Sequence, residues 1–448
     1  MSWASIELAG WGRTSRGAMT ACRPERMSEI RERMGEAAPG AGLIAHGAGR
    51  AYGDAALNAG GRVMLMRRLD RMLAFDPDIG LLEAEPGVRF ADLLAAFLPR
   101  GWLAPATPGT AFATLGGAVA NDVHGKNHDR MGSFGDHLAW IDLMLPSGEV
   151  VRVTEGADPA LFRATIGGLG LTGMVVGLGL KLMRVPSGAV RVRERRCRDL
   201  DTFLAALNEA RTRSAYSVGW IDGLARGGAL GRGILEEAEP EPAAELPARR
   251  ARQLNLPVDL PGFVLNGATV GLFNAAYFRR VPEGGRERLM PYARFLYPLD
   301  SIGQWNRIYG RGGFYQFQCV LPDATAPLGL RRMLEEISAA GRASFLAVLK
   351  TLGGEGRGFL SFPMRGFTLA LDFPRRPGVE DLLARLERLT LDHGGRIYLA
   401  KDAALSPEGF RRMYTRLPEF EAVLDRVDPE RRLNSDMARR LKIRDRAP

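Results

Sequence analysis

The chain has 448 residues, of which 46% are hydrophobic and 25% charged, and its formal net charge at pH 7 is +10. This composition is typical of a soluble globular protein of two or three domains, and it excludes disordered, collagen-like and small disulfide-stapled proteins. No stretch reaches the roughly 18 to 20 apolar residues of a membrane span, and the N-terminus lacks the pattern of a signal peptide. We therefore expect a cytoplasmic protein.

Cysteine and lysine usage narrows the classes further. Cys22, Cys197 and Cys319 are far apart and odd in number, which fits neither a disulfide framework nor a zinc cluster. Of the 61 basic residues only five are lysine, so each lysine is worth inspecting. Positive charge permits an anionic lipid, a phosphorylated ligand or a nucleic acid as partner. Because the arginines are scattered among acids and no zinc-finger spacing occurs, we expect no nucleic acid and no metal.

Residues 43–184 have the pattern of short strands, glycine-rich loops and few helices. Apolar runs bounded by Gly, Pro or Asp predict strands at Leu43–Ala45, Val63–Met66, Leu81–Ala84, Leu138–Leu145 and Met174–Met183. The apolar spacing in Phe90–Leu98 predicts a helix. This part of the chain therefore predicts an α+β domain, to which we assign residues 1–186.

The first glycine-rich loop, HGAGRAYGD at residues 46–54, directly follows a predicted strand. Gly47, Gly49 and Gly53 permit positive φ and close approach, so that backbone N–H groups can converge on an anion. A tight hairpin turn explains the same glycines equally well. The loop contains neither the strand-to-helix GxGxxG pattern nor the GK[ST] of a P-loop.

The second loop, residues 108–137, is richer in polar side chains. Its small residues at Gly116–Ala120 let the backbone lie against a planar or highly charged group, and donors and a titratable base follow them. This density of polar groups favours a binding site over two stacked turns. His124 and His128 are four residues apart, but Gly-Lys-Asn between them is a loop sequence and no third ligand follows, so we expect no metal there.

After Pro186 the pattern changes to longer helices and strands. Strands are predicted near Val190–Arg193, Tyr216–Ile221, Phe314–Leu321, Ser344–Lys350 and Phe367–Phe373, and helices near Leu200–Arg211, Leu328–Ala340 and Val379–His393. Their order predicts a substrate domain over 187–395, a broad antiparallel sheet with helices on one side that covers a cofactor. Residues 396–448 are expected to return to the first domain. Leu235–Pro261, rich in Pro, Glu and Ala, is either a surface insertion or a mobile flap over the substrate mouth.

Residues 43–184 resemble the FAD-binding domain of the vanillyl-alcohol oxidase and p-cresol methylhydroxylase type, in which two glycine-rich loops grip the pyrophosphate and the isoalloxazine. Motifs over nearly the whole chain are similar to a narrower family, the polyprenylphosphoryl-ribose 2-oxidases. They include GWGRT (11–15), GRAYGD (49–54), GGAVANDVHGKNH (116–128), FYQFQCVLP (314–322), YLAKD (398–402) and SDMARRL (435–441).

The resemblance implies a set of FAD contacts in both loops and in two later segments. They are Gly47, Ala48, Gly49, Arg50, Ala51, Tyr52, Gly53, Asp54, Gly109, Thr114, Leu115, Gly116, Gly117, Asn121, Asp122, Val123, His124, Val175 and Tyr398. Covalent relatives attach the flavin through a histidine of the first loop. The corresponding place here is near Ala51, and His46 stands several residues too early, so the resemblance implies non-covalent FAD.

Oxidation of a secondary alcohol needs removal of the hydroxyl proton, a path for hydride to the flavin, and donors where the reduced flavin gathers negative charge. In a chain that otherwise uses arginine, a site role for Lys126 and Lys401 is favoured over a surface charge. The resemblance implies that Lys401 lies beside the reacting carbinol as proton acceptor or electrostatic stabiliser. It implies that His124 and Lys126 position the substrate or its phosphate, and that Tyr52 lines the flavin.

The same resemblance implies a sugar pocket. Its members are Gln318, Lys350, Gln316, Tyr297, Asn306, Arg307, Trp220 and Ala370. Trp220 and Tyr297 are more often core aromatics at such positions. Ala370 stands where mycobacterial relatives carry a cysteine, and Thr368 where they carry an asparagine, which leaves the substrate and any sensitivity to cysteine-directed inhibitors open.

The function implied by the resemblance is oxidation of the 2′-hydroxyl of a polyprenylphosphoryl ribose to the 2′-keto sugar, the first half of an epimerisation to an arabinose donor for cell-envelope polysaccharide. A separate short-chain NAD(P)H-dependent reductase would complete it, and electrons would leave to a quinone or another acceptor. Any membrane contact would be peripheral, at the inner membrane. Two alternatives stay open: a sugar-lactone or alditol oxidase of the same superfamily, and a flavin-less protein that binds a lipid or polyanion.

Overall fold

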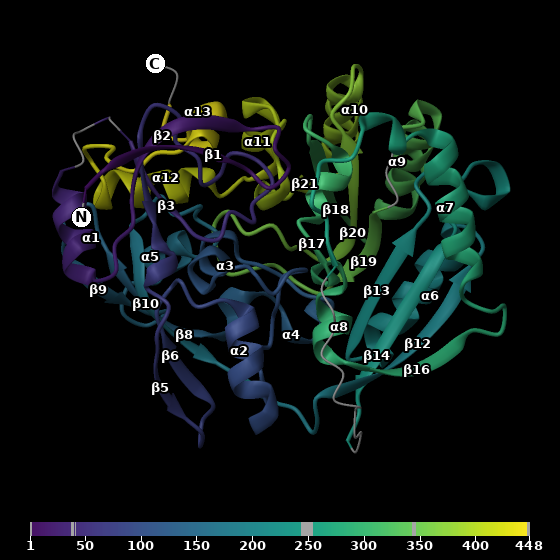
Figure 1. Ribbon diagram of the computed structural model, residues 1–448, viewed down its shortest axis with the longest axis horizontal. Helices are drawn as coiled ribbons and strands as arrows, with labels where there is room; N and C mark the ends of the chain where they lie inside the picture. The colour runs from purple at the N-terminus through teal and green to yellow at the C-terminus, as the bar shows by residue number, and fades with distance from the viewer. Residues whose placement is uncertain (1, 37–39, 41, 243–253, 343–345, 446–448) are drawn as a thin grey trace.

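The computed structural model describes residues 2–36, 40, 42–242, 254–342 and 346–445. Two parts of the chain lie side by side (Figure 1). The N-terminal part contains two sheets and also includes the last helices of the chain, and the other part is built on one broad sheet.

The first sheet of the N-terminal part joins the two ends of the chain. Its strands are β1 (Ala4–Ala9), β2 (Arg16–Cys22), β4 (Arg62–Leu65) and β3 (Leu43–His46), in that order, with helix α1 (Met27–Gly35) beside them. The Leu43 N–H donates to Arg432 O (2.9 Å), and the Asn434 N–H donates back to Leu43 O (3.1 Å). These bonds bring α11 (Pro407–Met413), α12 (Leu417–Val427) and α13 (Asp436–Arg440) onto the N-terminal part, as Figure 1 shows.

Whereas the first glycine-rich loop lies between β3 and β4 of the first sheet, the second sheet of this part flanks the second loop. Its strands are β5 (Met72–Asp76), β6 (Leu81–Ala84), β10 (Met174–Lys181), β8 (Leu138–Met144) and β9 (Val150–Val153), in that order. Its helices are α2 (Phe90–Phe97), α3 (Leu115–Asn121), α4 (His128–Met131) and α5 (Pro159–Thr165). The predicted strands and the predicted helix of this region are confirmed. The small residues of the second loop form α3, which is capped where the Gly117 N–H donates to Thr114 Oγ1 (3.3 Å).

The broad sheet is antiparallel throughout. In spatial order its strands are β16 (Arg286–Pro291), β12 (Ala189–Cys197), β14 (Gly233–Pro240), β13 (Tyr216–Ile221), β19 (Ala347–Leu352), β20 (Gly366–Pro374), β18 (Phe314–Pro322) and β21 (Arg396–Ile397). Helices α6 (Leu200–Arg213), α9 (Ala326–Ala340) and α10 (Val379–Asp392) cover one face. The predicted α+β class, with helices on one side of an antiparallel sheet, is confirmed. The remaining short elements are β7 (Trp102–Leu103), β11 (Met183–Arg184), β15 (Leu254–Asn255), β17 (Ile302–Gly303) and α8 (Tyr292–Leu296).

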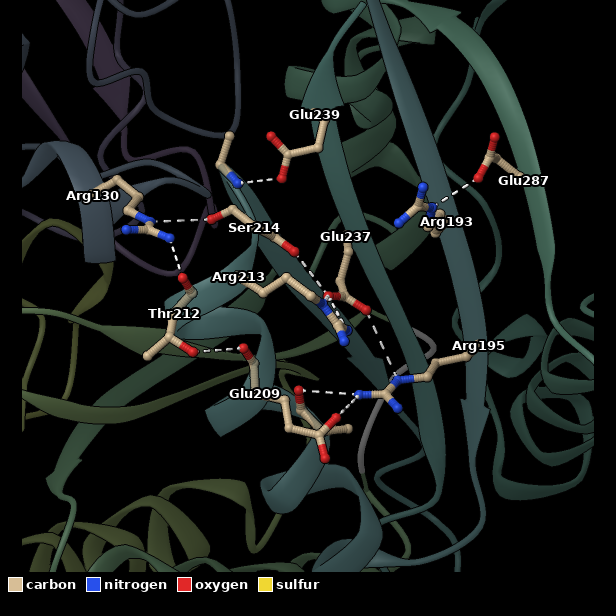
Figure 2. A network of polar contacts seen from close by, with 12 residues as sticks. Arg130, Arg193, Arg195, Glu209, Thr212, Arg213, Ser214, Glu237, Glu239 and Glu287 are labelled. Carbon is tan, nitrogen blue, oxygen red and sulfur yellow. Dashed lines mark hydrogen bonds and ion pairs between the residues drawn. The ribbon is translucent and has the colours of Figure 1, made fainter.

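The interpretation of 235–261 as one inserted or mobile segment is wrong at its start. Residues 235–240 belong to β14, which is hydrogen-bonded to β12 and β13 on its two sides. The acidic residues of β14 interrupt the apolar pattern by which a strand is recognised in the sequence. In the structure they lie beside donors from other elements. Glu237 accepts from Arg213 (2.7 Å) and from the Ser214 hydroxyl (2.8 Å), as Figure 2 shows. The later residues 243–253 lie outside the described part of the chain.

The cross-strand register decides which side chains face away from the helices. Residues directly opposite one another in an antiparallel sheet lie on the same face. Trp220 is opposite Val348, Val348 is opposite Ala370, and Ala370 is opposite Gln318. The neighbouring Cys319 is 3.8 Å from Met333 of α9, so its side of the sheet is the helix side. The row from Trp220 to Gln318, the open-face row, therefore lies on the other face. That face is covered partly by α7 (Gly267–Arg279) and partly by the N-terminal part.

Arg130 of α4 ties the N-terminal part to α6. Its guanidinium donates to Ser214 O (3.5 Å) and to Thr212 O at the C-terminal end of that helix (Figure 2). The Ser217 N–H of β13 donates to Lys126 O (2.9 Å). The second glycine-rich loop is therefore bonded directly to the broad sheet.

Candidate active site

The two glycine-rich loops meet. A Cβ added to Gly47 in the first loop would lie 2.6 Å from Thr114 Oγ1 in the second, a distance that side chains do not adopt. Gly49 has a φ of +64°, in the left-handed region that favours glycine. The two loops, which are distant in the sequence, therefore lie together, as the resemblance implies.

A third segment, residues 398–403, closes onto the first loop. The Tyr52 N–H donates to Ala400 O (2.9 Å), and a Cβ on Gly53 would lie 1.9 Å from Asp402 O. Arg440 of α13 holds both segments: it donates two bonds to the Asp54 carboxylate (2.8 Å each) and one to Asp402 Oδ2 (2.8 Å). The C-terminal helix thus connects the first loop to the residue after Lys401.

The side chains of these loops fit FAD. Among the described residues, three of the expected contacts carry a buried polar atom without a hydrogen-bond partner: Arg50 Nε, Asn121 Oδ1 and His124 Nδ1. Buried polar atoms are rarely left unpaired in a working protein. Gly109 has no atom within 4 Å of the place where a Cβ would stand. Unpaired donors and acceptors on a backbone cradle suit a ligand with phosphates and a polar ring edge.

Replacing Gly53 by alanine is expected to lower the free energy of unfolding by about 1–3 kcal/mol and to reduce the FAD content of the purified protein, because the new methyl group overlaps the backbone of Asp402. Thermal unfolding and flavin absorbance measure both effects. Gly35→Ala is the control, since no atom lies within 4 Å of its added Cβ. Equal behaviour of the two variants would contradict this close contact.

Histidine, glutamine and lysine side chains gather where the open-face row meets the second loop. The Gln318 side-chain amide donates to His124 Nε2 (3.2 Å). The same amide nitrogen also donates to Thr368 Oγ1 (3.1 Å). The Lys350 ammonium donates to Gly125 O (3.0 Å). Lys401 Nζ stands 3.9 Å from the centre of the Tyr52 ring. The structure therefore brings together five of the expected site residues, which we call the histidine cluster: His124, Gln318, Lys350, Lys401 and Tyr52.

Lys126 belongs to the same loop but points elsewhere along the sheet. Its ammonium donates to Phe295 O and lies 4.2 Å from the centre of that ring. Burial lowers its pKa to about 8, and Glu236 opposes this shift. Lys126 therefore lies between the histidine cluster and Glu236 of β14.

Burial makes this a site of shifted protonation equilibria. It lowers the pKa of Lys401 to about 8 and that of Lys350 to about 7. The pKa of His124 lies well below its usual value because of burial and, secondarily, the positive charge of Lys350. His124 is therefore neutral over the physiological range, whereas the lysines can change charge near pH 7–8.

Asp372 was missing from the expected site. It is fully buried on β20, accepts from Gln316 Nε2 (2.6 Å) and from the Tyr309 hydroxyl (2.9 Å), and has a pKa raised to about 7 by burial. Lys401 is the charged neighbour that opposes this shift. The sequence shows a carboxylate inside the apolar strand GFTLALDF, but it does not indicate which groups the fold places beside it.

Tyr398 closes the cluster on the loop side. Its ring is stacked on Phe362 (centroids 4.7 Å apart) and lies 5.1 Å from the His124 ring, while its hydroxyl donates to Asn121 O (3.1 Å). Phe362 was not among the expected residues, and nothing in its sequence neighbourhood indicated it.

The side chains of four expected residues are engaged in structural bonds. The Asp54 carboxylate is taken by Arg440. Asp122 accepts from the Gly135 N–H (2.9 Å) and the Ser361 hydroxyl (2.5 Å). Arg307 donates to Leu256 O and Pro257 O, and Asn306 to Trp11 O (3.1 Å). Their side chains therefore hold loops in place, and any cofactor contact of Asp54 and Asp122 would use the backbone.

Three more expected residues lie at the margins. Tyr297 is buried against Thr107, and burial raises its pKa. Val175 pairs with Leu143 within the second sheet. Trp220 packs on Tyr277 of α7, with ring centroids 4.8 Å apart, at the far end of the open-face row.

In the described ranges, no three His, Cys, Asp or Glu side chains are grouped so that they could hold a metal ion. No helix of those ranges combines the length and the apolar character needed to cross a bilayer.

Comparison with known proteins gives a family for this arrangement. A family model described as FAD binding domain matches residues 20–154. The chain is 34% identical to the decaprenylphosphoryl-β-D-ribose oxidase of Mycolicibacterium smegmatis, over 97% of both chains. It is 37% identical to an uncharacterized protein of Streptomyces coelicolor, over 79% of this chain and 99% of the other. A D-lactate dehydrogenase of Anaerostipes hadrus is 28% identical over 30% of each chain.

Proposed function

The chain belongs to the family of the decaprenylphosphoryl-β-D-ribose oxidases, and from this premise we propose that it is an FAD-dependent dehydrogenase of a polyprenylphosphoryl ribose. The 2′-hydroxyl is oxidised to the 2′-keto sugar, so that the carbon loses a hydride and the oxygen a proton. The observation that carries this proposal is the convergence of buried lysines and a neutral histidine on the loops of an FAD-binding domain.

When bound to these loops, FAD would supply the hydride acceptor for the alcohol carbon. We assign the hydroxyl proton to Lys401, because a buried ammonium with a pKa of about 8 is partly neutral near physiological pH and can act as a base. The Asp372 carboxyl, its charged neighbour, would tune that equilibrium. The Tyr52 ring supports the ammonium group and fixes its position.

The remaining polar groups bind and orient the sugar in this proposal. His124 and Gln318 form one hydrogen-bonded unit, so each restricts the rotamer of the other. Gln318 and Lys350 would contact the ribose, and Lys126 would lie toward the phosphate. Gln316 holds Asp372 and would act through it.

We propose that FAD is held non-covalently. The residue at the centre of the first loop, Ala51, has no nucleophilic side chain, and His46 is buried with its Nδ1 2.9 Å from Ala56 O. Precipitating the protein with acid is expected to release all flavin into the supernatant. Flavin that stays with the pellet would contradict this proposal.

The product would be the keto intermediate of an epimerisation to the arabinose sugar. A short-chain NAD(P)H-dependent reductase would reduce it, and a quinone or another acceptor would reoxidise the flavin. We propose a cytoplasmic protein with at most a peripheral contact at the inner membrane.

Reduction of the enzymatic product with borodeuteride tests the oxidised position. If the proposal holds, hydrolysis yields ribose and arabinose that both carry deuterium at C2, because hydride can add to either face of a 2-ketone. Deuterium at another carbon, or turnover of free alditols or sugar lactones in place of the lipid-linked sugar, would overturn it.

Thiol reagents are expected to leave the enzyme active. Cys22, Cys197 and Cys319 are all buried, and burial raises their pKa values to about 11, 11 and 12. Ala370→Cys would place a thiol in the open-face row beside Gln318, so iodoacetamide should inactivate this variant. Ala370→Ser is the matched control. Inactivation of the unmodified enzyme would contradict the burial of its three cysteines. Full resistance of Ala370→Cys would contradict the placement of this row in the sugar pocket.

A further inference from the structure

An uncharged stretch covers part of the open face. From Leu260 to Phe278 the sequence contains no Asp, Glu, Lys or Arg, although a quarter of the whole chain is charged. This stretch forms α7 and the turn before it. Several of its apolar side chains reach the surface: Phe263 and Leu272 are each 75% exposed and Phe273 is 45% exposed. Adjacent exposed apolar side chains of this size are a mark of a binding surface.

The inner side of α7 is fixed to the sheet. Asn274 is buried and donates to Asp222 Oδ1 (2.6 Å), and Val270 is buried one turn earlier. At the end of the helix, Arg280 pairs with Glu194 (2.8 Å) and Glu236 (3.2 Å) of the broad sheet. The exposed apolar side chains therefore stand on a helix that is anchored by polar bonds, not on a loose loop.

A row of cross-strand neighbours, which we call the track, connects this helix with the histidine cluster. It starts at Gln318, which is bonded to His124, and follows the open-face row through Ala370 and Val348 to Trp220. The track continues on α7, where the rings of Trp220 and Tyr277 are 4.8 Å apart and those of Tyr277 and Phe273 are stacked at 5.6 Å. Leu272, which directly precedes Phe273 on this helix, is exposed.

We propose that this track binds the first part of the isoprenoid chain of the substrate, with Tyr277, Phe273 and Leu272 as its outer contacts. The inference rests on the proposed function, since it needs a lipid-linked sugar. A surface patch that faces a membrane need not connect with the reaction site. A binding site for the isoprenoid chain must connect with it, because the chain is attached to the sugar through the phosphate. The open-face row continues into the rings of Trp220, Tyr277 and Phe273. This connection therefore favours the substrate chain over a bilayer as the occupant.

The experiment compares two substrates in detergent solution: polyprenylphosphoryl ribose with a long isoprenoid chain and an analogue with a single isoprene unit. The variant is Leu272→Ser combined with Phe273→Ser. Both side chains are exposed, so folding should be preserved, and thermal unfolding checks this. We expect KM for the long-chain substrate to rise by about tenfold or more, relative to the change for the short one, because two apolar contacts are lost. Leu328→Ser on α9, which is 53% exposed on the helix-covered side, is the control.

Equal effects on both substrates, or no effect on either, would overturn the inference. An effect that occurs only when the long-chain substrate is embedded in phospholipid vesicles, and not in detergent, would also overturn it in favour of membrane docking. If the unmodified enzyme oxidises neither substrate although it holds FAD, the proposed function itself fails. That result is distinct from a failure of the track, in which the unmodified enzyme is active and the variant shows no dependence on chain length.

Discussion

Replacing Lys401 by methionine is expected to lower kcat by about 10²- to 10⁴-fold while FAD stays bound, since a positioned acid or base contributes an effect of this size. Methionine keeps the length and the apolar stem of the side chain, so its packing on the Tyr52 ring is largely preserved. Steady-state turnover and the flavin absorbance of the same preparation separate loss of chemistry from loss of cofactor. Lys181→Met, at the exposed end of β10, is the matched control.

The pH dependence decides how Lys401 acts. Burial lowers its pKa to about 8, so the neutral amine gains population as the pH rises through that value. A base therefore gives a kcat that increases with pH up to an inflection near 8, and Lys401→Met removes the inflection. A kcat that falls through the same range would overturn the role as base and assign Lys401 to charge stabilisation. His124 is not expected to add an inflection near neutral pH, because burial lowers its pKa well below the usual value.

Replacing Arg440 by leucine is expected to lower the free energy of unfolding by about 3–5 kcal/mol, because it leaves the buried carboxylates of Asp54 and Asp402 without their common partner. The same change frees the first loop from the segment that carries Lys401, so FAD should be lost during purification. Arg440→Lys should restore only part of the stability, since one ammonium cannot make the two parallel bonds to Asp54.

Arg439→Leu is the control for Arg440. Its partner is Asp436 on the same exposed helix turn, a type of ion pair worth at most about 1 kcal/mol. Thermal unfolding followed by flavin fluorescence measures both variants. Equal melting temperatures for the two variants, or full flavin retention in Arg440→Leu, would contradict the conclusion that α13 holds the first glycine-rich loop in place.

Much of the fold was predictable because its periodicity is regular. In α10 the apolar residues Leu382, Leu383 and Leu386 repeat at helical spacing, and they are buried in the structure. Strand β14 was not predictable in this way, because Glu236, Glu237 and Glu239 interrupt its pattern and find their partners on other elements. The helix α7 was missed for the opposite reason: its apolar residues occur all round, and several of them remain exposed.

The candidate site was predictable where residue choice was unusual. Lys126, Lys350 and Lys401 stood out in a chain that uses arginine almost everywhere, and all three are located at the loop–sheet junction. Asp372 and Arg440 were not found, since a single carboxylate in a strand and one arginine among 56 carry no local signal of what the fold brings beside them. Their partners are distant in the sequence and are set by strand register and by the return of the C-terminal helix.

Anaerobic mixing of the purified, FAD-loaded protein with polyprenylphosphoryl ribose, followed by visible spectroscopy, is the most direct test of the proposed chemistry. We expect the absorption of oxidised flavin to disappear as the 2′-keto sugar forms in equal amount. A spectrum that stays unchanged with this substrate, or a protein that cannot be loaded with FAD at all, would contradict it.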